Sequence, residues 1–172
     1  MNIIAAVSSD WGIGLDNQLL FRIPEDQKFF KSMTTDKVVV MGYNTLLSLP
    51  GSKPLPNRVN IVLSRKPTRM PGVVVCESMD ALNTRLRDFA PDDVFIIGGQ
   101  KVYAQLLDQC QFAYITKIQA APEADAFFPD LDMLPHWKLI ESSDEKIHNG
   151  LCYRFHKYEN FHKLYSFSSK KP

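Results

Sequence analysis

Short runs of β-branched and apolar residues, which alternate with segments of helical pattern, constrain the fold of this chain most strongly. Several of these runs are apolar on both faces, which is typical of strands in a sheet that is covered on both sides. Strands that alternate with helices across short connections predict an α/β domain with a mostly parallel sheet. The runs lie at residues 3–7, 37–41, 59–63, 72–76 and 94–97.

Later segments at residues 112–118, 137–140 and 151–158 alternate between apolar and polar side chains, so we expect partly antiparallel strands there.

The helical segments carry boundary signals of their own. Pro24 stands at a first helical position with acidic residues directly after it, which predicts a helix over residues 24–34. Further helices are expected over residues 43–49, 78–89 and 100–107.

The length and composition favour one globular domain. The chain has 172 residues, of which 45% are hydrophobic and 23% charged, and both values are ordinary for a globular protein. The net charge of +1 does not favour nucleic acid or anionic membranes as partners. No apolar run reaches the roughly 20 residues that span a bilayer. We expect a cytoplasmic monomer, because the N-terminus lacks the basic segment of a signal peptide and no heptad pattern indicates a second copy.

The cysteine and histidine residues do not form a pattern for metal or nucleophilic chemistry. Cys76, Cys110 and Cys152 are far apart, and no Cys/His cluster has the spacing of metal ligands. We therefore expect reduced thiols and no metal. The four histidines lie in the last quarter of the chain without a nucleophile motif. A metal-dependent or triad hydrolase is disfavoured.

Asp26 lies on the apolar face of the helix expected over residues 24–34. Phe29, Phe30 and Met33 follow it by spacings that place all four residues on one face. A carboxylate in this position either borders a ligand pocket or complements the helix dipole in the first turn. The two interpretations predict opposite effects, because burial raises the pKa of Asp26 and the dipole lowers that pKa.

Two predicted strands end at glycine and continue directly into helices. Gly98 and Gly99 follow the strand at 94–97, and Gly42 follows the strand at 37–41. Glycine lets backbone approach a ligand closely, and the free N–H groups of a following helix suit a phosphate. Neither sequence is GxGxxG or a Walker loop, so each junction is either a tight turn or one half of a pyrophosphate site.

Basic residues stand at both ends of the strand at 59–63. Ser64, Arg65 and Lys66 follow it, and they either hold a terminal phosphate or are solvated charges at a strand end. Arg58 precedes the strand. Its partner is either the carboxylate of a ligand or an acid on the protein surface.

Taken together and in order, these segments resemble dihydrofolate reductase over residues 1 to about 158. Each motif alone is weak, but their order and separations are specific. The stretches that carry the resemblance are Ile4-Ala-Ala-Val7, Gly12-Ile-Gly-Leu-Asp-Asn17, Ile23-Pro-Glu-Asp26 with Phe29 and Phe30, Val40-Met-Gly42 with Thr45, Pro54-Leu-Pro-Asn-Arg58, Asn60-Ile-Val-Leu-Ser64, Ile97-Gly-Gly99 with Val102 and Tyr103, and Asp125 with Phe128-Pro-Asp130.

The resemblance implies a dihydrofolate-reductase-like α/β fold. Its central eight-stranded mixed sheet is mostly parallel, has an antiparallel C-terminal strand and is flanked by helices. A single domain would cover residues 1–160, with an adenosine-binding subdomain at about 38–91. Residues 161–172 become rich in lysine and serine, so we expect a flexible tail there.

The implied activity is the NADPH-dependent reduction of 7,8-dihydrofolate to 5,6,7,8-tetrahydrofolate, which supports one-carbon metabolism and thymidylate synthesis and is a target of antifolates. Hydride would pass directly to C6, and N5 would gain a proton from water. Asp26 would hold the pterin, Thr116 would hydrogen-bond Asp26, and Arg58 would clamp the glutamate carboxylate. The other substrate contacts are implied for Ile4, Ala5, Phe30, Leu49, Leu55 and Ile97.

The resemblance also implies where NADPH binds. Ala6, Ile13 and Tyr103 would border the nicotinamide, and a mobile lid over residues 12–22 would cover it. Gly98 and Gly99 would be joined by a cis peptide. The remaining cofactor contacts are implied for Gly14, Gly42, Tyr43, Asn44, Thr45, Leu63, Ser64, Arg65, Lys66, Gly98, Gly99, Gln100, Lys101 and Val102.

This chain departs from the family pattern at several positions. Tyr43 stands where many members carry an arginine for the 2′-phosphate, and Arg65 and Lys66 can replace that charge. Phe21, a candidate catalytic position, stands where many members have a tryptophan that holds a water, and phenylalanine cannot donate a hydrogen bond. Ala126 replaces a hydroxyl residue near the lid.

Two other functions compete with this interpretation. The first is a reductase of the same fold that acts on a riboflavin-pathway pyrimidine; the pairing of Asp26 with Arg58 favours folate over it. The second is a nucleotide-binding module without catalysis, to which Phe21 and Tyr43 point.

Overall fold

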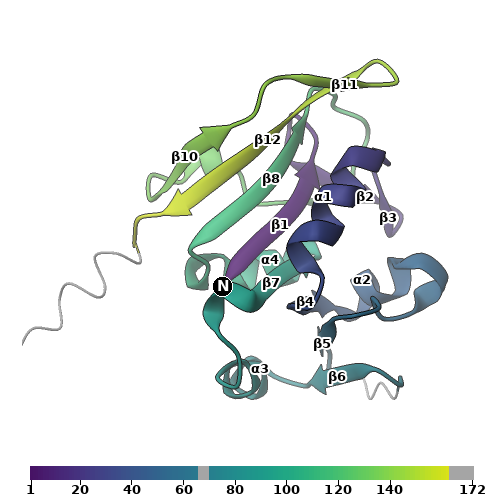
Figure 1. Cartoon of the computed structure of the whole chain (residues 1–172), viewed down its shortest axis with the longest axis vertical. Coiled ribbons are helices and arrows are strands. Elements are labelled where there is room, and N and C mark those ends of the chain that lie inside the picture. The colour runs from purple at the N-terminus through teal and green to yellow at the C-terminus, as the bar shows by residue number, and fades with distance from the viewer. Residues whose placement is uncertain (66–69, 163–172) are drawn as a thin grey trace, which may run out of the picture.

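The structure, a computed structural model, describes residues 1–65 and 70–162. The sequence-based predictions for Lys66 and for a flexible tail beyond residue 162 lie outside this part of the chain. Within it, one large sheet and one small sheet are packed with four α-helices, and Figure 1 shows how the helices cover the large sheet.

The large sheet contains nine strands, eight of them in the order β10-β12-β8-β1-β7-β4-β5-β6, and β11 pairs with β12. The strands from β8 to β6 along this order pair in parallel, and β12 is antiparallel to both β8 and β10. The predicted mostly parallel sheet with an antiparallel C-terminal strand is confirmed. Its strands are β1 (Asn2–Val7), β4 (Val38–Gly42), β5 (Val59–Leu63), β6 (Val73–Cys76), β7 (Val94–Gly98), β8 (Phe112–Ile118), β10 (Trp137–Ser142), β11 (Lys146–His148) and β12 (Leu151–Asn160).

The four helices begin where the sequence signals place them. Pro24 opens the first helix, and the hydroxyl of Ser78 caps the third by accepting a hydrogen bond from the Ala81 amide at 3.1 Å. The helices are α1 (Pro24–Thr34), α2 (Tyr43–Ser48), α3 (Met79–Leu86) and α4 (Gln100–Leu106). Short 3₁₀ turns lie at η1 (Pro50–Ser52), η2 (Pro91–Asp93), η3 (Leu107–Gln109) and η4 (Leu131–Met133).

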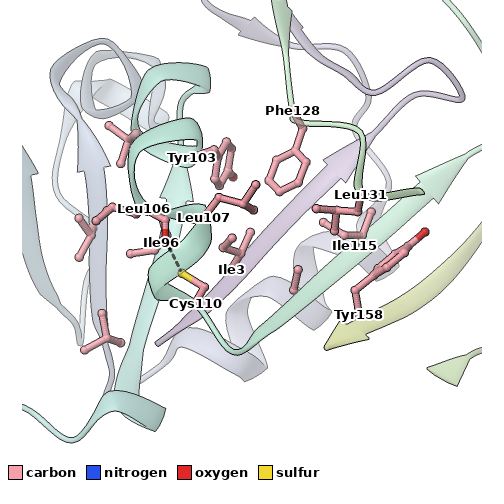
Figure 2. Packing of buried hydrophobic residues seen from close by; sticks show 14 of the residues in the cluster. Ile3, Ile96, Tyr103, Leu106, Leu107, Cys110, Ile115, Phe128, Leu131 and Tyr158 are labelled. Carbon is pink, nitrogen blue, oxygen red and sulfur yellow. Dashed lines mark hydrogen bonds between the residues drawn. The ribbon is translucent and has the colours of Figure 1, made fainter. Parts of the chain in front are cut away.

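The main hydrophobic core lies between one face of the large sheet and the helices α3 and α4. Figure 2 shows Ile3 and Ile96 of the sheet packed with Leu106 of α4 and with Phe128. The thiol of Cys110 donates a hydrogen bond to the Leu106 carbonyl oxygen at 3.3 Å. This continuous apolar layer fixes the position of α4 on the sheet.

The opposite face of the sheet is less completely filled. Buried side chains of β4 and β5 pack there with Leu46 of α2. α1 crosses the same face in front of β1 (Figure 1), but Thr34 is the only residue of that helix that is buried. α1 therefore lies over the sheet with its apolar side chains only half-buried.

A small sheet of order β3-β2-β9 lies beside this arrangement. Its strands are β2 (Gly12–Leu15), β3 (Gln18–Leu19) and β9 (Ala126–Phe127). The turn of the β2–β3 hairpin is formed by Asp16 and Asn17, which both have positive φ, 49° and 59°. Such values suit a two-residue hairpin turn, and Asn and Asp tolerate them better than most residues. The predicted lid segment is thus a hairpin that β9 joins to the rest of the chain.

Candidate functional site

A cleft of about 900 Å³ lies at the carboxyl ends of β4, β5, β6 and β7. In open α/β sheets this edge is where ligands bind, because the strands end there and the helices begin. Its lining residues are Asn17, Gly42, Tyr43, Asn44, Thr45, Leu63, Ser64, Arg65, Glu77, Ser78, Met79, Gly99, Gln100, Lys101, Val102, Gln105, Asp125 and Ala126.

Most residues predicted to contact the cofactor line this cleft. They come from the ends of β4, β5 and β7 and from the first turns of α2 and α4. The predicted residues that do not line it are Ala6, Ile13, Gly14, Gly98 and Tyr103, and Lys66 lies outside the described residues.

The two glycine junctions meet in the structure, as the sequence interpretation of a divided pyrophosphate site requires. Met41 of β4 lies opposite Gly98 of β7 in the parallel ladder. A Cβ atom on Gly99 would lie 3.2 Å from the hydroxyl oxygen of Thr45. The bond between Gly98 and Gly99 is cis. The backbone of Gly99 therefore lies close to the Thr45 hydroxyl, and a side chain at position 99 would have to displace that hydroxyl by a few tenths of an ångström.

Tyr103 lies beneath the Gly98–Gly99 junction. Its hydroxyl donates a hydrogen bond to the Ile4 carbonyl oxygen at 2.9 Å, and the side chain is buried. Burial raises the pKa of Tyr103, so the phenol stays neutral and remains a donor. This bond joins α4 to β1, which lies next to β7 in the middle of the large sheet.

Asp26 lies on α1 and faces β8. The Thr116 hydroxyl donates a hydrogen bond to Asp26 Oδ1 at 2.6 Å, and Thr116 is buried. Burial raises the pKa of Asp26, and the smaller effect of the Thr116 hydrogen bond lowers that pKa. The net shift is upward because the effect of burial is larger than that of the Thr116 hydrogen bond. The sequence left this choice open, and the structure favours a carboxylate in an apolar setting.

Arg58 is held at the other end of α1. Its Nε donates to Thr34 Oγ1 at 2.9 Å, and a terminal nitrogen donates to the Pro56 carbonyl oxygen at 2.7 Å. The guanidinium lies 6.0 Å from the centre of the Phe30 ring. Within residues 1–65 and 70–162, Arg58 forms no ion pair. These bonds fix its orientation, and the Asp36 carboxylate acts on its charge without forming an ion pair with it.

Several other predicted substrate residues border the same face of the sheet. Leu49, Leu55 and Ile97 pack as half-buried side chains around the β4–β5 cluster, and Phe30 is half-buried on α1. These residues form an incompletely covered apolar surface on the α1 side of the sheet. The side chain of Ala5, in contrast, packs against the main core on the other face. Phe21 and Ala6 belong to a neighbouring cluster around Ile23 and Tyr153.

Asp125 connects the lid hairpin to the rest of the site. Its Oδ2 accepts a hydrogen bond from the Asp16 amide at 3.0 Å, and its own amide donates to the Gly14 carbonyl oxygen at 3.0 Å. Two residues further along the chain, in β9, the Phe127 amide donates a hydrogen bond to Gln100 Oε1 at 2.9 Å. The hairpin is therefore linked through β9 to the first residue of α4.

Sequence reasoning missed the polar network at the start of α1. Glu25 accepts a hydrogen bond from the Tyr153 hydroxyl at 2.7 Å and pairs with Lys146 Nζ at 2.7 Å. These partners lower the pKa of Glu25, and burial with the Glu25 carboxylate raises the pKa of Tyr153 to about 12. The network ties the turn that carries Asp26 to β11 and β12. No local pattern signals it, because Tyr153 is remote in sequence.

Sequence reasoning also missed cleft residues at the end of β6. Glu77, Ser78 and Met79 line the cleft because β6 lies next to β5. The register of two parallel strands would have found them, since it places residue 77 beside the predicted Ser64 and Arg65. Within the described residues, no group of His, Cys, Asp or Glu side chains is arranged to hold a metal ion.

The fold and the site define an α/β protein with a nucleotide-sized cleft at the strand ends and a carboxylate and an arginine at opposite ends of one helix. Comparison with known proteins then gives the family. A dihydrofolate reductase model matches residues 1–160, and the chain belongs to the dihydrofolate reductase family.

Several relatives agree with this assignment. The dihydrofolate reductase of Neisseria gonorrhoeae is 36% identical over 157 residues, which cover 90% of this chain and 94% of the relative. That of Haemophilus influenzae is 37% identical over 131 residues, with 76% and 79% covered. Dihydrofolate reductase type 3 of Salmonella typhimurium is 38% identical over 144 residues, with 83% and 86% covered.

No helix in the part of the chain that the structure describes is both long enough and apolar enough to cross a membrane.

Proposed function

We propose that this chain reduces 7,8-dihydrofolate to 5,6,7,8-tetrahydrofolate with NADPH, and that Asp26 and Arg58 bind the two ends of the substrate. Membership of the dihydrofolate reductase family supports the reaction and the use of a nicotinamide cofactor. The observation that carries the assignment of residues is the placement of one carboxylate and one arginine at opposite ends of α1.

The spacing of these two groups fits an elongated substrate. Asp26 is in the first turn of α1, and Arg58 is bonded to Thr34 at its end. Eight residues of α-helix separate Asp26 from Thr34, a rise of roughly 12 Å. Dihydrofolate has a pterin edge that a carboxylate can bind and, beyond the benzoyl group, a glutamate that a guanidinium can bind. Phe30, Leu49 and Leu55 supply the apolar contacts between the two ends.

The cleft at the strand ends suits a dinucleotide. The Gly42 and Gly98–Gly99 junctions bring backbone and the Thr45 hydroxyl together, which favours a pyrophosphate between them. Arg65 and Lys101 line the same cleft and can offset phosphate charge. Arg65 lies at the end of β5, away from α4, which supports a 2′-phosphate there and NADPH over NADH. The strands and helices at residues 38–91 supply this adenosine end.

The reaction needs no covalent intermediate. When bound, the reduced nicotinamide would supply a hydride to C6 of the substrate. Asp26 would hold the 2-amino group and ring nitrogen of the pterin before and during the transfer, and its charge would raise the basicity of N5. Thr116 holds the carboxylate in one orientation. Phe21 cannot donate a hydrogen bond, so we infer that water delivers the N5 proton without help from that side chain.

The proposal extends to the location and the oligomeric state of the protein. A cytoplasmic monomer is consistent with a family of small reductases and with a site built from one chain. Antifolates are expected to bind at the same place and to donate hydrogen bonds to the Asp26 carboxylate.

The test is absorbance at 340 nm after mixing the protein with NADPH and dihydrofolate. The proposal predicts a fall in absorbance with formation of tetrahydrofolate, and Asp26→Asn is expected to lower turnover at neutral pH by roughly 100-fold or more. Tight NADPH binding without turnover would favour a nucleotide-binding module. Turnover of a phosphoribityl-amino-pyrimidine in place of dihydrofolate would favour the flavin-pathway reductase.

A further inference from the structure

Two side chains of opposite charge follow β5 and β6 into the cleft. Leu63 of β5 lies opposite Cys76 of β6 in a parallel ladder, and the Ser64 amide donates to the Cys76 carbonyl oxygen at 2.9 Å. Arg65 and Glu77 therefore leave the sheet on adjacent strands. Both line the cleft.

Neither charge is neutralised by the part of the protein that the structure describes. Over residues 1–65 and 70–162, Arg65 and Glu77 form no ion pair, and the Glu77 side chain is exposed. Of the charged residues that line the cleft, Arg65 and Lys101 are basic, and Glu77 and Asp125 are acidic. The described walls of the cleft thus carry balanced charge, although the proposed cofactor is a polyanion.

We propose that Glu77 is a specificity residue that limits the preference of this chain for NADPH over NADH. The inference rests on the proposed function. A 2′-phosphate carries close to two negative charges, which Arg65 attracts and Glu77 repels. A free 2′-hydroxyl can instead donate a hydrogen bond to the Glu77 carboxylate, the interaction by which an acidic residue of Rossmann folds binds the ribose of NAD. The two side chains favour opposite cofactors.

Glu77 is not needed to start the neighbouring helix. Ser78 is the cap of α3, because its hydroxyl accepts the Ala81 amide. A carboxylate at position 77 can at most interact with the dipole of α3, worth about 0.3–1 kcal/mol at an exposed site. Such an effect would change the stability of the protein but would not change the ratio of its affinities for two nucleotides.

The test compares two nucleotides that differ only in the 2′-phosphate, adenosine 2′,5′-bisphosphate and adenosine 5′-monophosphate. Their dissociation constants are measured by calorimetry for the wild type, Glu77→Gln and Glu77→Lys. The affinity ratio of bisphosphate to monophosphate is expected to rise roughly 3- to 10-fold in E77Q and further in E77K. The increase should shrink at high salt. The NADPH/NADH ratio of kcat/KM should move in the same direction.

Asp92→Lys is the matched control, because it changes the net charge by the same amount as E77K. Asp92 is exposed and precedes β7, at the amino ends of the strands and away from the cleft. An affinity ratio that stays within twofold in E77Q and E77K, or that D92K raises equally, would overturn the inference. If dihydrofolate is not reduced, the proposed function fails, but the nucleotide affinities still decide the role of Glu77.

Discussion

At the scale of single residues, the burial of Asp26, the proposed pterin-binding group, is expected to lower the stability of the free protein. Burial raises the pKa of its carboxyl above the unfolded value, so the folded state disfavours the charged form. The free energy of unfolding therefore decreases as pH rises from the unfolded pKa to the folded pKa, and stays lower above it. A charge held in this way suits a ligand that supplies its missing hydrogen bonds.

Replacing Asp26 with Asn tests this linkage. The amide that replaces the carboxyl would be neutral at every pH, and its oxygen can still accept the Thr116 hydroxyl. The variant should unfold at higher urea concentration than the wild type at pH 7, and the difference should vanish below the unfolded pKa of about 3.9. Urea unfolding at several pH values measures this. If Asp26→Asn were less stable than the wild type at pH 7, this result would contradict the raised pKa of Asp26.

Thr116→Val removes the hydroxyl that donates to Asp26 with little change in volume. The hydrogen bond favours the charged carboxylate, so its loss should raise the pKa of Asp26 further. The acidic limb of the pH profile of kcat/KM should move to higher pH. Thr116→Ser keeps the donor and should leave the limb in place. If the pH profiles of kcat/KM were equal for Thr116→Val and Thr116→Ser, the Thr116 hydrogen bond would not control the pKa of Asp26.

Residue-level predictions from sequence succeeded where the signal was local. The helical spacing of Asp26, Phe29 and Phe30 was sufficient to find the face that looks onto the sheet. The Glu25–Tyr153 bond joins residues 128 positions apart, so its existence depends on β12 lying beside β8. The same limit applies to Glu77, which enters the cleft only because β5 and β6 are neighbours.

At the scale of elements, the junction between β7 and α4 requires glycine at position 98. Gly98 has a φ of 118°, and a Cβ there would lie 3.1 Å from Tyr103 Cε2. Gly98→Ala therefore combines an unfavourable backbone conformation with overpacking. It should lower the free energy of unfolding by roughly 2–5 kcal/mol in urea unfolding.

Gly150→Ala is the control for the backbone contribution. Gly150 has a φ of 80°, but a Cβ there would meet nothing within 4 Å. Gly150→Ala should lower the free energy of unfolding by only about 1–2 kcal/mol. Equal costs at positions 98 and 150 would mean that contact with the Tyr103 ring is unimportant.

The lid hairpin depends on a single side chain for its link at the turn. Asp125→Ala removes the acceptor of the Asp16 amide, an exposed bond worth about 0.5–1.5 kcal/mol. Hydrogen exchange of the hairpin amides should accelerate by roughly 2- to 10-fold, while exchange in β1 should be unchanged. Asp125→Asn keeps an oxygen acceptor and should exchange like the wild type. Faster exchange throughout the molecule would instead indicate a global loss of stability.

At the scale of the whole molecule, the sequence was sufficient to predict eight of the nine strands in the large sheet, those of the order β10-β12-β8-β1-β7-β4-β5-β6. It was also sufficient to predict all four helices of the described residues. The apolar runs of the strands, Pro24 at the start of α1 and the Ser78 cap of α3 were the local signals behind these predictions. The small sheet was not predicted, because β3 and β9 have two residues each and no alternation can be recognised over that length. Pairing between Gly14 and Ala126 is a tertiary contact that no local pattern reports.

The two parts of the proposed site also follow from the sheet. β1 and β7 lie at its centre, with the nucleotide-sized cleft on the side of β4, β5 and β6 and Asp26 over β8. Tyr103 connects the two parts through its bond to the Ile4 carbonyl oxygen. Under the proposed function, a cofactor that spans from the cleft to the centre of the sheet would end next to a substrate under α1.

The central claim is that Asp26 and Arg58, at the two ends of α1, bind the two ends of a single substrate. The most direct measurement combines an Arg58 variant with a shortened substrate. The KM of wild type and Arg58→Leu is measured for dihydrofolate and for dihydropteroate, which lacks the glutamate. The account predicts that R58L raises the KM for dihydrofolate by roughly 10- to 100-fold and leaves that for dihydropteroate within about twofold. An equal rise for both substrates would contradict it, because Arg58 would then act without binding the glutamate carboxylate.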